Sequence, residues 1–527
     1  MLLAGWRRAL VAFGAGLVAT LALAPVNVPA VGFLSFPLLV WLIDGASGEP
    51  GHGLMRRSLP AFRVGWCFGF GYFLGGLWWL GSAMLVDGED FLWALPLAVV
   101  GLPAILALYH GLAAAVARLL WSDGPARLLA LAAAFAGFEA LRGALLTGFP
   151  WNEIGVMAAP VPLLMGSVAL VGLHGLTLAA IFVFSLPALA VGARRGRGVA
   201  LGLGLVLVAG HVGIGAWRLS AAPAGTQPGV ELRIVQPNIL QSQKWDAAEA
   251  ERIFARLLDL TAAPWAGPVP DAPAGEPPRR LVVWPESSFP FVLTDRPDAV
   301  ARLAETLKPG ETLLAGATRV EAGSGEPRFY NSVYVIGEDG AVEGAGDKLH
   351  LVPFGEYLPF QALLESWGIR QLTELPGGFS AGAARRVMAA GEGGLRFLPL
   401  VCYEIIFGDE IDAAGERPDF ILNVTNDAWY GLTPGPSQHL RQAQLTAVAF
   451  GLPLVRAANT GISVVADAAG RPVAGLALGE GGTVDAALPL AGPPTPFVRY
   501  ANRPFLAALL LAAIIAGAAA ISLSRRD

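Results

Sequence analysis

FLPLVCYEIIFG, residues Phe397–Gly408, is an apolar run interrupted by a cysteine, a tyrosine and a glutamate. The segment before Cys402 shows no alternation of polar and apolar residues, which is typical of a strand buried on both faces. Short segments rich in β-branched residues recur on both sides of it, between residues 231 and 467. This pattern predicts an α/β domain with a buried sheet.

Helical patterns lie between these strand segments. We expect helices at 246–261, with Asp246 as the cap, at 297–307 and at 438–449. The proline-rich stretch 263–278 is interpreted as a loop insertion.

The composition of the whole chain is too apolar for an ordinary soluble enzyme. Of its 527 residues, 54% are hydrophobic and 15% are charged, and the mean hydropathy is +0.56. The apolar excess lies in 1–220 and 504–523, whereas 221–500 has an ordinary charge density. We therefore predict a membrane domain over 1–220, a catalytic domain over 221–500, and a closing helix with a short tail over 504–527.

A membrane-spanning helix needs about 20 apolar residues. By that measure, spans are predicted at roughly 9–24, 29–44, 64–86, 91–117, 128–147, 160–192, 199–217 and 505–523. Arginines cluster in alternate connections, and such clusters favour the cytoplasmic side. An inside start and seven spans place 221–500 on the outer side of the membrane, facing the periplasm. There is no ready supply of ATP on that side, so any transfer chemistry there must use an already activated or ester-type donor.

Charge and cysteine content exclude other classes of protein. The chain has two cysteines, Cys67 and Cys402, far apart in sequence, so no disulfide is predicted. A net charge of −5 and the lack of a basic patch with interleaved aromatics give no reason to expect nucleic-acid binding. The protein is expected to act as a monomer.

Three predicted strand ends carry unusual polar residues, namely Glu286, Lys348 and Cys402. A thiol must become a thiolate to attack an ester, and a carboxylate with a nearby lysine supplies a proton acceptor and a stabilising charge. Taken singly, each residue has a more common explanation: packing for the cysteine, and solvation for the lysine and the glutamate. The spacing by itself leaves these alternatives open.

The local contexts of the three residues carry a resemblance. VVWPESSFP, GDKLHLVPFGEYLP and LVCYEIIFGD, in this order, resemble the nitrilase, or carbon-nitrogen hydrolase, superfamily with its αββα sandwich. With the predicted spans, the whole chain resembles the bacterial apolipoprotein N-acyltransferases. GFPWNEIG, VQPNILQSQKWD, NVTNDAWYG and LVRAANTGIS resemble further stretches of that family.

The resemblance implies roles for individual residues. Glu286 corresponds to the general base, Lys348 to the cation that stabilises the oxyanion, and Cys402 to the nucleophile, while Glu356 corresponds to an acid that orients the lysine. Further positions correspond to residues that contact substrate or support the architecture: Trp245, Asn331, Tyr403, Glu404 and, in the membrane domain, Trp151. Phe450 stands where a glutamate is often found in the family, and no role is assigned to it.

The implied reaction is a two-step acyl transfer with ping-pong kinetics. The acyl chain of a phospholipid passes to the cysteine as a thioester. It then passes to the α-amino group of the diacylglyceryl cysteine of an apolipoprotein. The resemblance implies no cofactor and no metal. The apolar stretch Val352–Leu372 is either an interfacial loop that gates the site or a buried helical hairpin.

Two other functions remain open. A membrane-tethered amidase would use the same three residues with water as acceptor on small amides. A transporter or a non-catalytic scaffold is disfavoured because the predicted spans contain almost no charges of the kind that mark a transport path.

Overall fold

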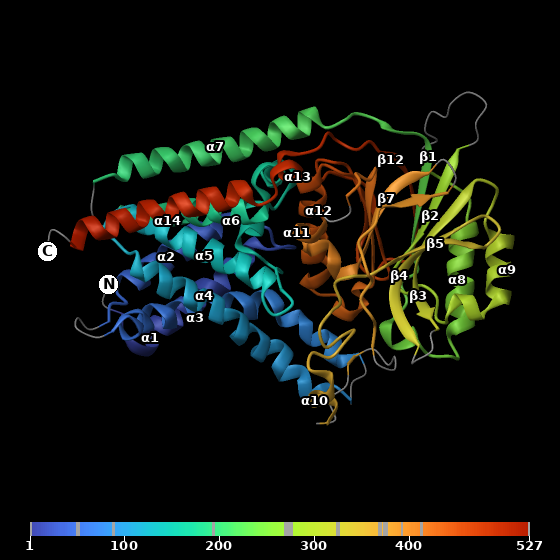
Figure 1. The fold of residues 1–527 in the computed structure, drawn as a ribbon, viewed down its shortest axis with the longest axis horizontal. Helices are drawn as coiled ribbons and strands as arrows, with labels where there is room; N and C mark the ends of the chain where they lie inside the picture. Colours follow the sequence, from blue (N-terminus) through green and yellow to red (C-terminus); the bar gives the residue numbers. More distant parts are fainter. Residues whose placement is uncertain are drawn as a thin grey trace. The chain divides into compact units, whose positions relative to one another are not determined.

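The computed structural model describes residues 3–48, 53–86, 90–191, 195–267, 278–322, 327–366, 371–372, 378–391, 394–411 and 415–524. The chain divides into two compact units. The first comprises 1–221, 433–445 and 494–527, and the second comprises 222–432 and 446–493. Figure 1 shows the first unit as helices and the second as sheets with flanking helices.

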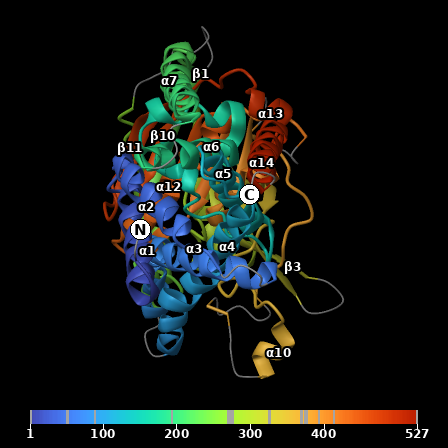
Figure 2. The ribbon, with the colours of Figure 1, turned by 90° about the vertical axis from the view of Figure 1, so that its left-hand side faces the viewer.

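The first unit is helical. Its helices are α1 (Gly5–Ala19), α2 (Gly32–Asp44), α3 (Leu54–Leu77), α4 (Leu102–Leu119), α5 (Ala126–Ala144), α6 (Val168–Ser185), α7 (Arg197–Ala221), α13 (Pro496–Tyr500), α14 (Arg503–Ser524) and the first part of α12 (Pro434–Phe450). α14 packs on α5 and α6, next to which it lies in Figures 1 and 2. The end of the chain thus joins the helices formed by its beginning.

A helix overlaps each of the eight predicted spans. Among the described residues, four helical segments are long and apolar enough to cross a membrane: Leu92–Leu119, Val168–Ala190, Arg197–Ala221 and Arg503–Ser522. A fifth apolar segment, Pro29–Asp44, is shorter. These helices are those of a membrane protein, while the number of eight spans stays a prediction.

The first unit contains buried charges that we did not expect. His110 on α4 lies 2.5 Å from Glu139 on α5, and Arg142, one turn along α5, pairs with the same carboxylate. All three side chains are at most 1% exposed. This cluster qualifies the expectation that the spans hold almost no buried charge of the kind that marks a transport path. Sequence counting finds single charges, but only packing shows that they neutralise each other in one cluster.

The second unit contains two six-stranded sheets. The first sheet has the order β12-β1-β2-β3-β4-β5, and the second has the order β11-β10-β9-β8-β7-β6. The first six strands are β1 (Thr226–Gln236), β2 (Arg279–Trp284), β3 (Glu311–Glu321), β4 (Arg328–Ile336), β5 (Val342–Asp347) and β6 (Met388–Ala390). The others are β7 (Leu395–Val401), β8 (Phe420–Thr425), β9 (Leu454–Ala458), β10 (Ser463–Ala466), β11 (Pro472–Leu476) and β12 (Gly482–Pro489).

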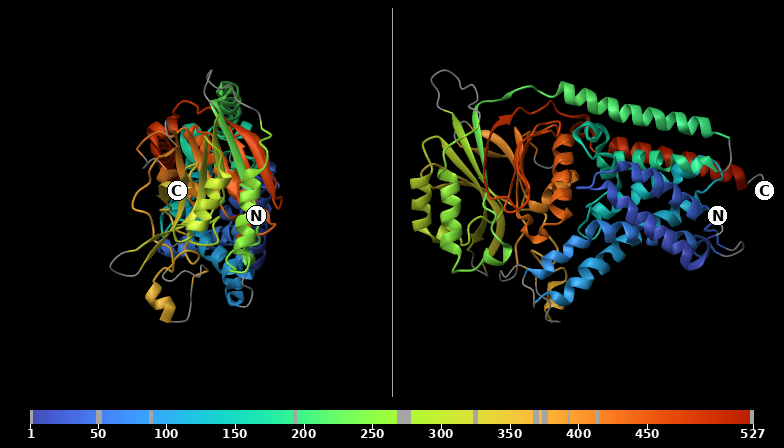
Figure 3. Two further views of the ribbon diagram at one scale, coloured as in Figure 1. Left: turned by 90° about the vertical axis from the view of Figure 1, so that its right-hand side faces the viewer. Right: turned by 180° about the vertical axis from the view of Figure 1, so that it is seen from behind.

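Helices cover the sheets, as the sandwich requires. α8 (Ala250–Ala262) and α9 (Pro297–Thr306) lie on the outer face of the first sheet (Figure 3, right). α8 buries Ile253, Phe254, Leu257 and Leu258 in the same apolar cluster as Trp284 of β2. Neighbouring members of this set lie one, three or four positions apart, which is the spacing of the buried face of an amphipathic helix. The predicted αββα sandwich is confirmed, but Asp246 does not cap α8, because its carboxylate accepts from the amide of Ala248 in the preceding turn.

Strand direction brings the functional segments to one edge. β1, β2 and β3 are parallel, as are β7, β8 and β9. β4 runs antiparallel to both β3 and β5, so β5 has the same direction as β1, β2 and β3. The carboxyl ends of β1, β2 and β5 therefore share one edge of the first sheet, and those of β7 and β8 share one edge of the second. Residues that follow these five strands can meet there.

Candidate functional site

Cys402 sits on a sharp turn directly after β7. Its φ of 55° is in the left-handed region, which costs a residue with a Cβ roughly 1–2 kcal/mol. The chain turns there into a short 3₁₀ helix, Cys402–Ile406, and the side chain of Asn423 on β8 donates to the carbonyl oxygen of Cys402. Such strain persists only where the surroundings fix it, and it concentrates at functional sites.

The carboxylate of Glu286 is fixed from both sheets. It follows β2, where Oε1 accepts from Nδ2 of Asn331 on β4 at 2.7 Å. Oε2 accepts from the backbone amide of Asn426, which follows β8, at 2.8 Å. Glu286 is 8% exposed. Both oxygens therefore have fixed directions, as a group that moves a proton along a defined path requires.

Lys348 is buried and paired. Its Nζ lies 2.9 Å from Oε2 of Glu356, and it is 1% exposed. Glu356 also accepts from Nδ2 of Asn331, at 2.9 Å through Oε1, so Asn331 links the carboxylates of Glu286 and Glu356. The ion pair with Glu356 thus keeps the Lys348 ammonium charged and holds it in a fixed position.

Glu404 ties the Lys348 loop to the Cys402 turn. Its Oε1 accepts from the amides of Leu349 and His350 at 2.8 and 3.1 Å, and its Oε2 accepts from the amide of Val401 at 2.9 Å. Arg385 donates to Oε1 at 3.2 Å. One carboxylate therefore joins the segment that follows Lys348 to the residue that precedes Cys402.

The surroundings keep the Cys402 thiol protonated at rest. Burial and the charge of Glu286 raise its pKa, and they outweigh the lowering by Lys348 and by a hydrogen bond with Thr425. For Lys348, burial lowers the pKa, but the charges of Glu356 and Glu286 raise it above its ordinary value. The arrangement is thus a neutral thiol beside a carboxylate and a fully charged lysine.

Two family models match the chain. The model of the apolipoprotein N-acyltransferase N-terminal domain matches residues 15–186, and the carbon-nitrogen hydrolase model matches residues 231–492. A protein of Brucella suis named apolipoprotein N-acyltransferase is 53% identical over 502 residues, which are 94% of this chain and 92% of the relative. The chain belongs to the apolipoprotein N-acyltransferase family. A relative of the same name from Sinorhizobium fredii is 52% identical over 493 residues, 93% of this chain and 91% of its own.

Solved structures resemble part of the chain. An amidase from Nesterenkonia is 19% identical, with a TM-score of 0.35. The match covers 54% of this chain and 97% of the amidase.

The remaining predicted residues, Tyr403, Trp245 and Trp151, lie in different surroundings. Tyr403 is buried and packs edge-on against Phe407, next to the Cys402 turn. Trp245 is 48% exposed, unlike Glu286, Lys348 and Cys402, which are buried. Trp151 belongs to the first unit, where it is 1% exposed and donates from Nε1 to Oε1 of Gln438. A residue of an aromatic belt would face outward, so the burial of Trp151 does not fit a belt position.

Sequence reasoning missed three residues of the site. Asn426 supplies the amide to Glu286, and Lys244 donates from Nζ to the backbone carbonyl of Glu286 at 2.8 Å. Burial, and then the charge of Cys402, raises the pKa of Tyr430. All three lie in stretches that carry the family resemblance, but these stretches give no periodic pattern that would mark which side chains point inward.

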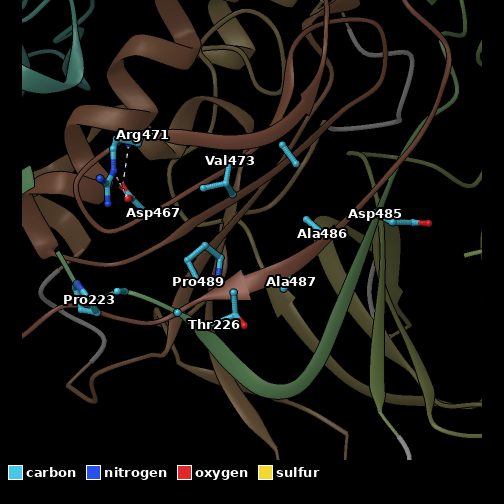
Figure 4. A pocket seen from close by; sticks show the side chains of 12 residues that line it. Pro223, Thr226, Asp467, Arg471, Val473, Asp485, Ala486, Ala487 and Pro489 are labelled. Carbon is cyan, nitrogen blue, oxygen red and sulfur yellow. Dashed lines mark hydrogen bonds and ion pairs between the residues drawn. The ribbon is translucent and has the colours of Figure 1, made fainter. Parts of the chain in front are cut away.

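Among the described residues, no group of three or more His, Cys, Asp and Glu side chains is placed to hold a metal ion. A pocket of about 370 Å³ lies in the second unit, where Thr226, Asp467, Arg471 and Asp485 are among its lining residues (Figure 4). The ion pair of Asp467 and Arg471, at 2.6 Å, borders it. Glu286, Lys348 and Cys402 do not line this pocket, so it is separate from the candidate site.

The described part of the stretch Val352–Leu372 carries three large, exposed apolar side chains, although Glu356 and Leu358 within it are buried. Phe354 is 54%, Phe360 83% and Leu363 51% exposed. α10 (Gln361–Ser366) has no buried residue. For these residues the buried hairpin is wrong, because their apolar side chains face outward. Residues 367–370 lie outside the described part.

Gly316 on β3 makes room for the Glu286 turn. A Cβ there would come within 2.4 Å of the Pro285 carbonyl oxygen and 2.5 Å of the Glu286 Cα. We expect Gly316→Ala to displace Glu286 and to lower the rate of acyl transfer about tenfold or more, because misplacing a reacting group by about 1 Å has effects of that size or larger. Single-turnover kinetics measure this, and Ala317→Gly on the same strand is the comparison. Unchanged kinetics in Gly316→Ala would contradict the tight contact.

Proposed function

We propose that the protein transfers an acyl chain from a phospholipid to the α-amino group of the N-terminal diacylglyceryl cysteine of apolipoproteins, with Cys402 as the nucleophile. The observation that carries this is the buried cysteine on a strained turn beside Glu286 and Lys348. The names of relatives that are about half identical over nearly the whole chain support it.

In the first step, Glu286 takes the thiol proton as Cys402 Sγ attacks the ester carbonyl of the phospholipid. The C=O bond becomes an oxyanion, which Lys348 stabilises with a charge that Glu356 holds in place. The carbon–oxygen bond of the ester then breaks, and the leaving oxygen takes the proton from Glu286. A lysophospholipid departs, and the acyl chain remains as a thioester. Because the resting thiol is neutral, proton transfer and attack belong to the same step.

In the second step, the α-amino group of the lipoprotein attacks the thioester carbonyl. Glu286 accepts a proton from the nitrogen, and the carbon–sulfur bond breaks as an amide forms. The proton returns to the thiolate and restores the enzyme. Neither step consumes a nucleotide or uses a metal, so the chemistry fits a donor that is already in the membrane.

The location follows from the same proposal. We place the chain in the bacterial inner membrane, with 221–500 on the periplasmic side, on the strength of the arginine pattern in the connections. The domain limits 1–220, 221–500 and 504–527 and a monomeric state belong to this proposal. The exposed Phe360 and Leu363 suit a segment that touches the lipid interface.

The test is a transfer assay with the purified full-length chain. It uses phospholipid labelled in one acyl chain and a synthetic diacylglyceryl lipopeptide. We expect the label to move to the lipopeptide amine only when both are present. Release of labelled fatty acid without transfer, together with hydrolysis of small amides, would instead support the tethered amidase.

A further inference from the structure

Lysine is rare in this chain, and its few positions are informative. Of 36 basic residues, only three are lysines: Lys244, Lys308 and Lys348. Lys308 is exposed, whereas Lys244 and Lys348 are 4% and 1% exposed. The chain uses arginine almost everywhere that a positive charge suffices. Two of its three lysines lie buried in one site, where a compact ammonium and a planar guanidinium are not interchangeable.

Lys244 follows β1 at the edge where the site residues meet. Its Nζ donates to the backbone carbonyl oxygen of Glu286 at 2.8 Å, which is the one hydrogen bond that this ammonium makes within the described residues. An ammonium carries three N–H groups. The charges that act on it come from the other two elements at this edge, Glu286 after β2 and Cys402 after β7.

The charge balance of the site explains why a second cation is needed. Lys348 is paired with Glu356, at 2.9 Å. Glu286 receives only neutral donors, from Asn331 and Asn426, and in the described part of the chain no basic side chain lies within ion-pair distance of its carboxylate. The charge of Lys348 also acts on Glu286 and Cys402, but Lys348 is already paired with Glu356 and balances a buried negative charge on either group only in part.

We propose that Lys244 is a positioning residue of the acyl-transfer site, whose buried ammonium balances the negative charge that passes between Glu286 and Cys402. This inference rests on the roles of Glu286 and Cys402 proposed above. Lys244, Lys348, Glu286 and Glu356 together form a buried cluster of two ammonium groups and two carboxylates. As the thiol proton moves to Glu286, the negative charge moves to sulfur and stays within the field of the same ammonium. The hydrogen bond to the Glu286 carbonyl also fixes the turn that carries the base.

Lys244 gives the site a specific pH dependence. Burial lowers its pKa from 10.5 to about 8, against the opposing charges of Glu286 and Cys402. Below pH 8 the ammonium is charged and the cluster is balanced. As the pH rises through 8 the charge is lost, so the rate of acyl-enzyme formation falls. Arginine stays charged throughout this range.

The test measures single-turnover acyl-enzyme formation from phosphatidylethanolamine vesicles between pH 6.5 and 9.5. The wild-type rate is expected to decline above about pH 8. Lys244→Met is expected to be about 10- to 100-fold slower below pH 8. Lys244→Arg is expected to recover part of the rate and to lack the decline above pH 8. Because both proteins act on the same vesicles, the ratio of the wild-type rate to the Lys244→Arg rate cancels any titration of the lipid headgroup. Lys308→Met is the matched control and is expected to follow the wild type.

A wild-type rate that keeps rising to pH 9.5, or a Lys244→Met rate equal to that of the wild type, would overturn the proposal. If Lys244→Met does not fold, the comparison of Lys244→Arg with the wild type over the same pH range decides it. As a second readout, Cys402 is alkylated in a Cys67→Ala background, where it is the remaining thiol. Folded Lys244→Met is expected to react about tenfold more slowly at pH 7.5, since its thiolate lacks the counter-charge, and equal alkylation would indicate a purely structural lysine. Absence of any acyl-enzyme in the wild type would count against the proposed function instead.

Discussion

Replacing Cys402 with alanine is expected to abolish the acyl-enzyme and to reduce acyl transfer to background. The thioester forms on this sulfur, and without it the chain has no group at that position that can carry the acyl chain. Losses of about 10³–10⁶-fold are usual when a nucleophile is removed. Intact-mass measurement after incubation with phospholipid is the direct check, because wild type gains the mass of one acyl chain.

Cys67→Ala is the matched control, since it removes the other cysteine of the chain. We expect it to keep the adduct and the activity. An acyl adduct on Cys402→Ala, or its loss in Cys67→Ala, would place the nucleophile elsewhere. Removing a buried side chain also leaves a small cavity, so thermal unfolding should be measured alongside to show that Cys402→Ala is folded.

Glu286→Gln is expected to slow acyl-enzyme formation by about 10²–10⁴-fold, the usual contribution of a general base. Glutamine has the same shape, and its carbonyl oxygen can still accept from Asn331 or from the Asn426 amide. What it cannot do is accept the thiol proton. Single-turnover kinetics with labelled phospholipid measure the loss, and Glu305→Gln, on the exposed side of α9, is the control.

The same variant gives a second, opposite signal. The charge of Glu286 raises the pKa of the Cys402 thiol, so its removal is expected to lower that pKa. The thiolate should then form at a lower pH, as measured by its ultraviolet absorbance, while catalysis is lost. A higher thiol pKa in Glu286→Gln would contradict the electrostatics of the site. Unchanged acylation would contradict the role of Glu286 as base.

Much of the site could be anticipated from the chain itself, and the failures have clear causes. Cys402 and Glu286 each follow a strand that reads as buried, whereas Lys348 follows β5, which has no buried residue, and its motif marked it instead. Trp245 was selected from its motif, yet it is 48% exposed, while the adjacent Lys244 is 4% exposed and contacts Glu286. Neither residue lies in a regular strand or helix, so no period in the sequence tells which of them points inward.

The sequence by itself determined the class of the protein. Its apolar content requires a membrane, its strands without polar alternation require a buried sheet, and the order of its motifs specifies the family. Only the tertiary structure decided how the charges are paired. Glu404 spans the Lys348 loop and the Cys402 turn, Asn331 links two carboxylates, and Lys244 reaches Glu286 from another strand end. Apart from the local contact of Glu404 with the Val401 amide, these contacts join residues from 25 to 55 positions apart along the chain. Local physics fixes the elements, but the burial and pairing of charges depend on which strand ends the fold brings together.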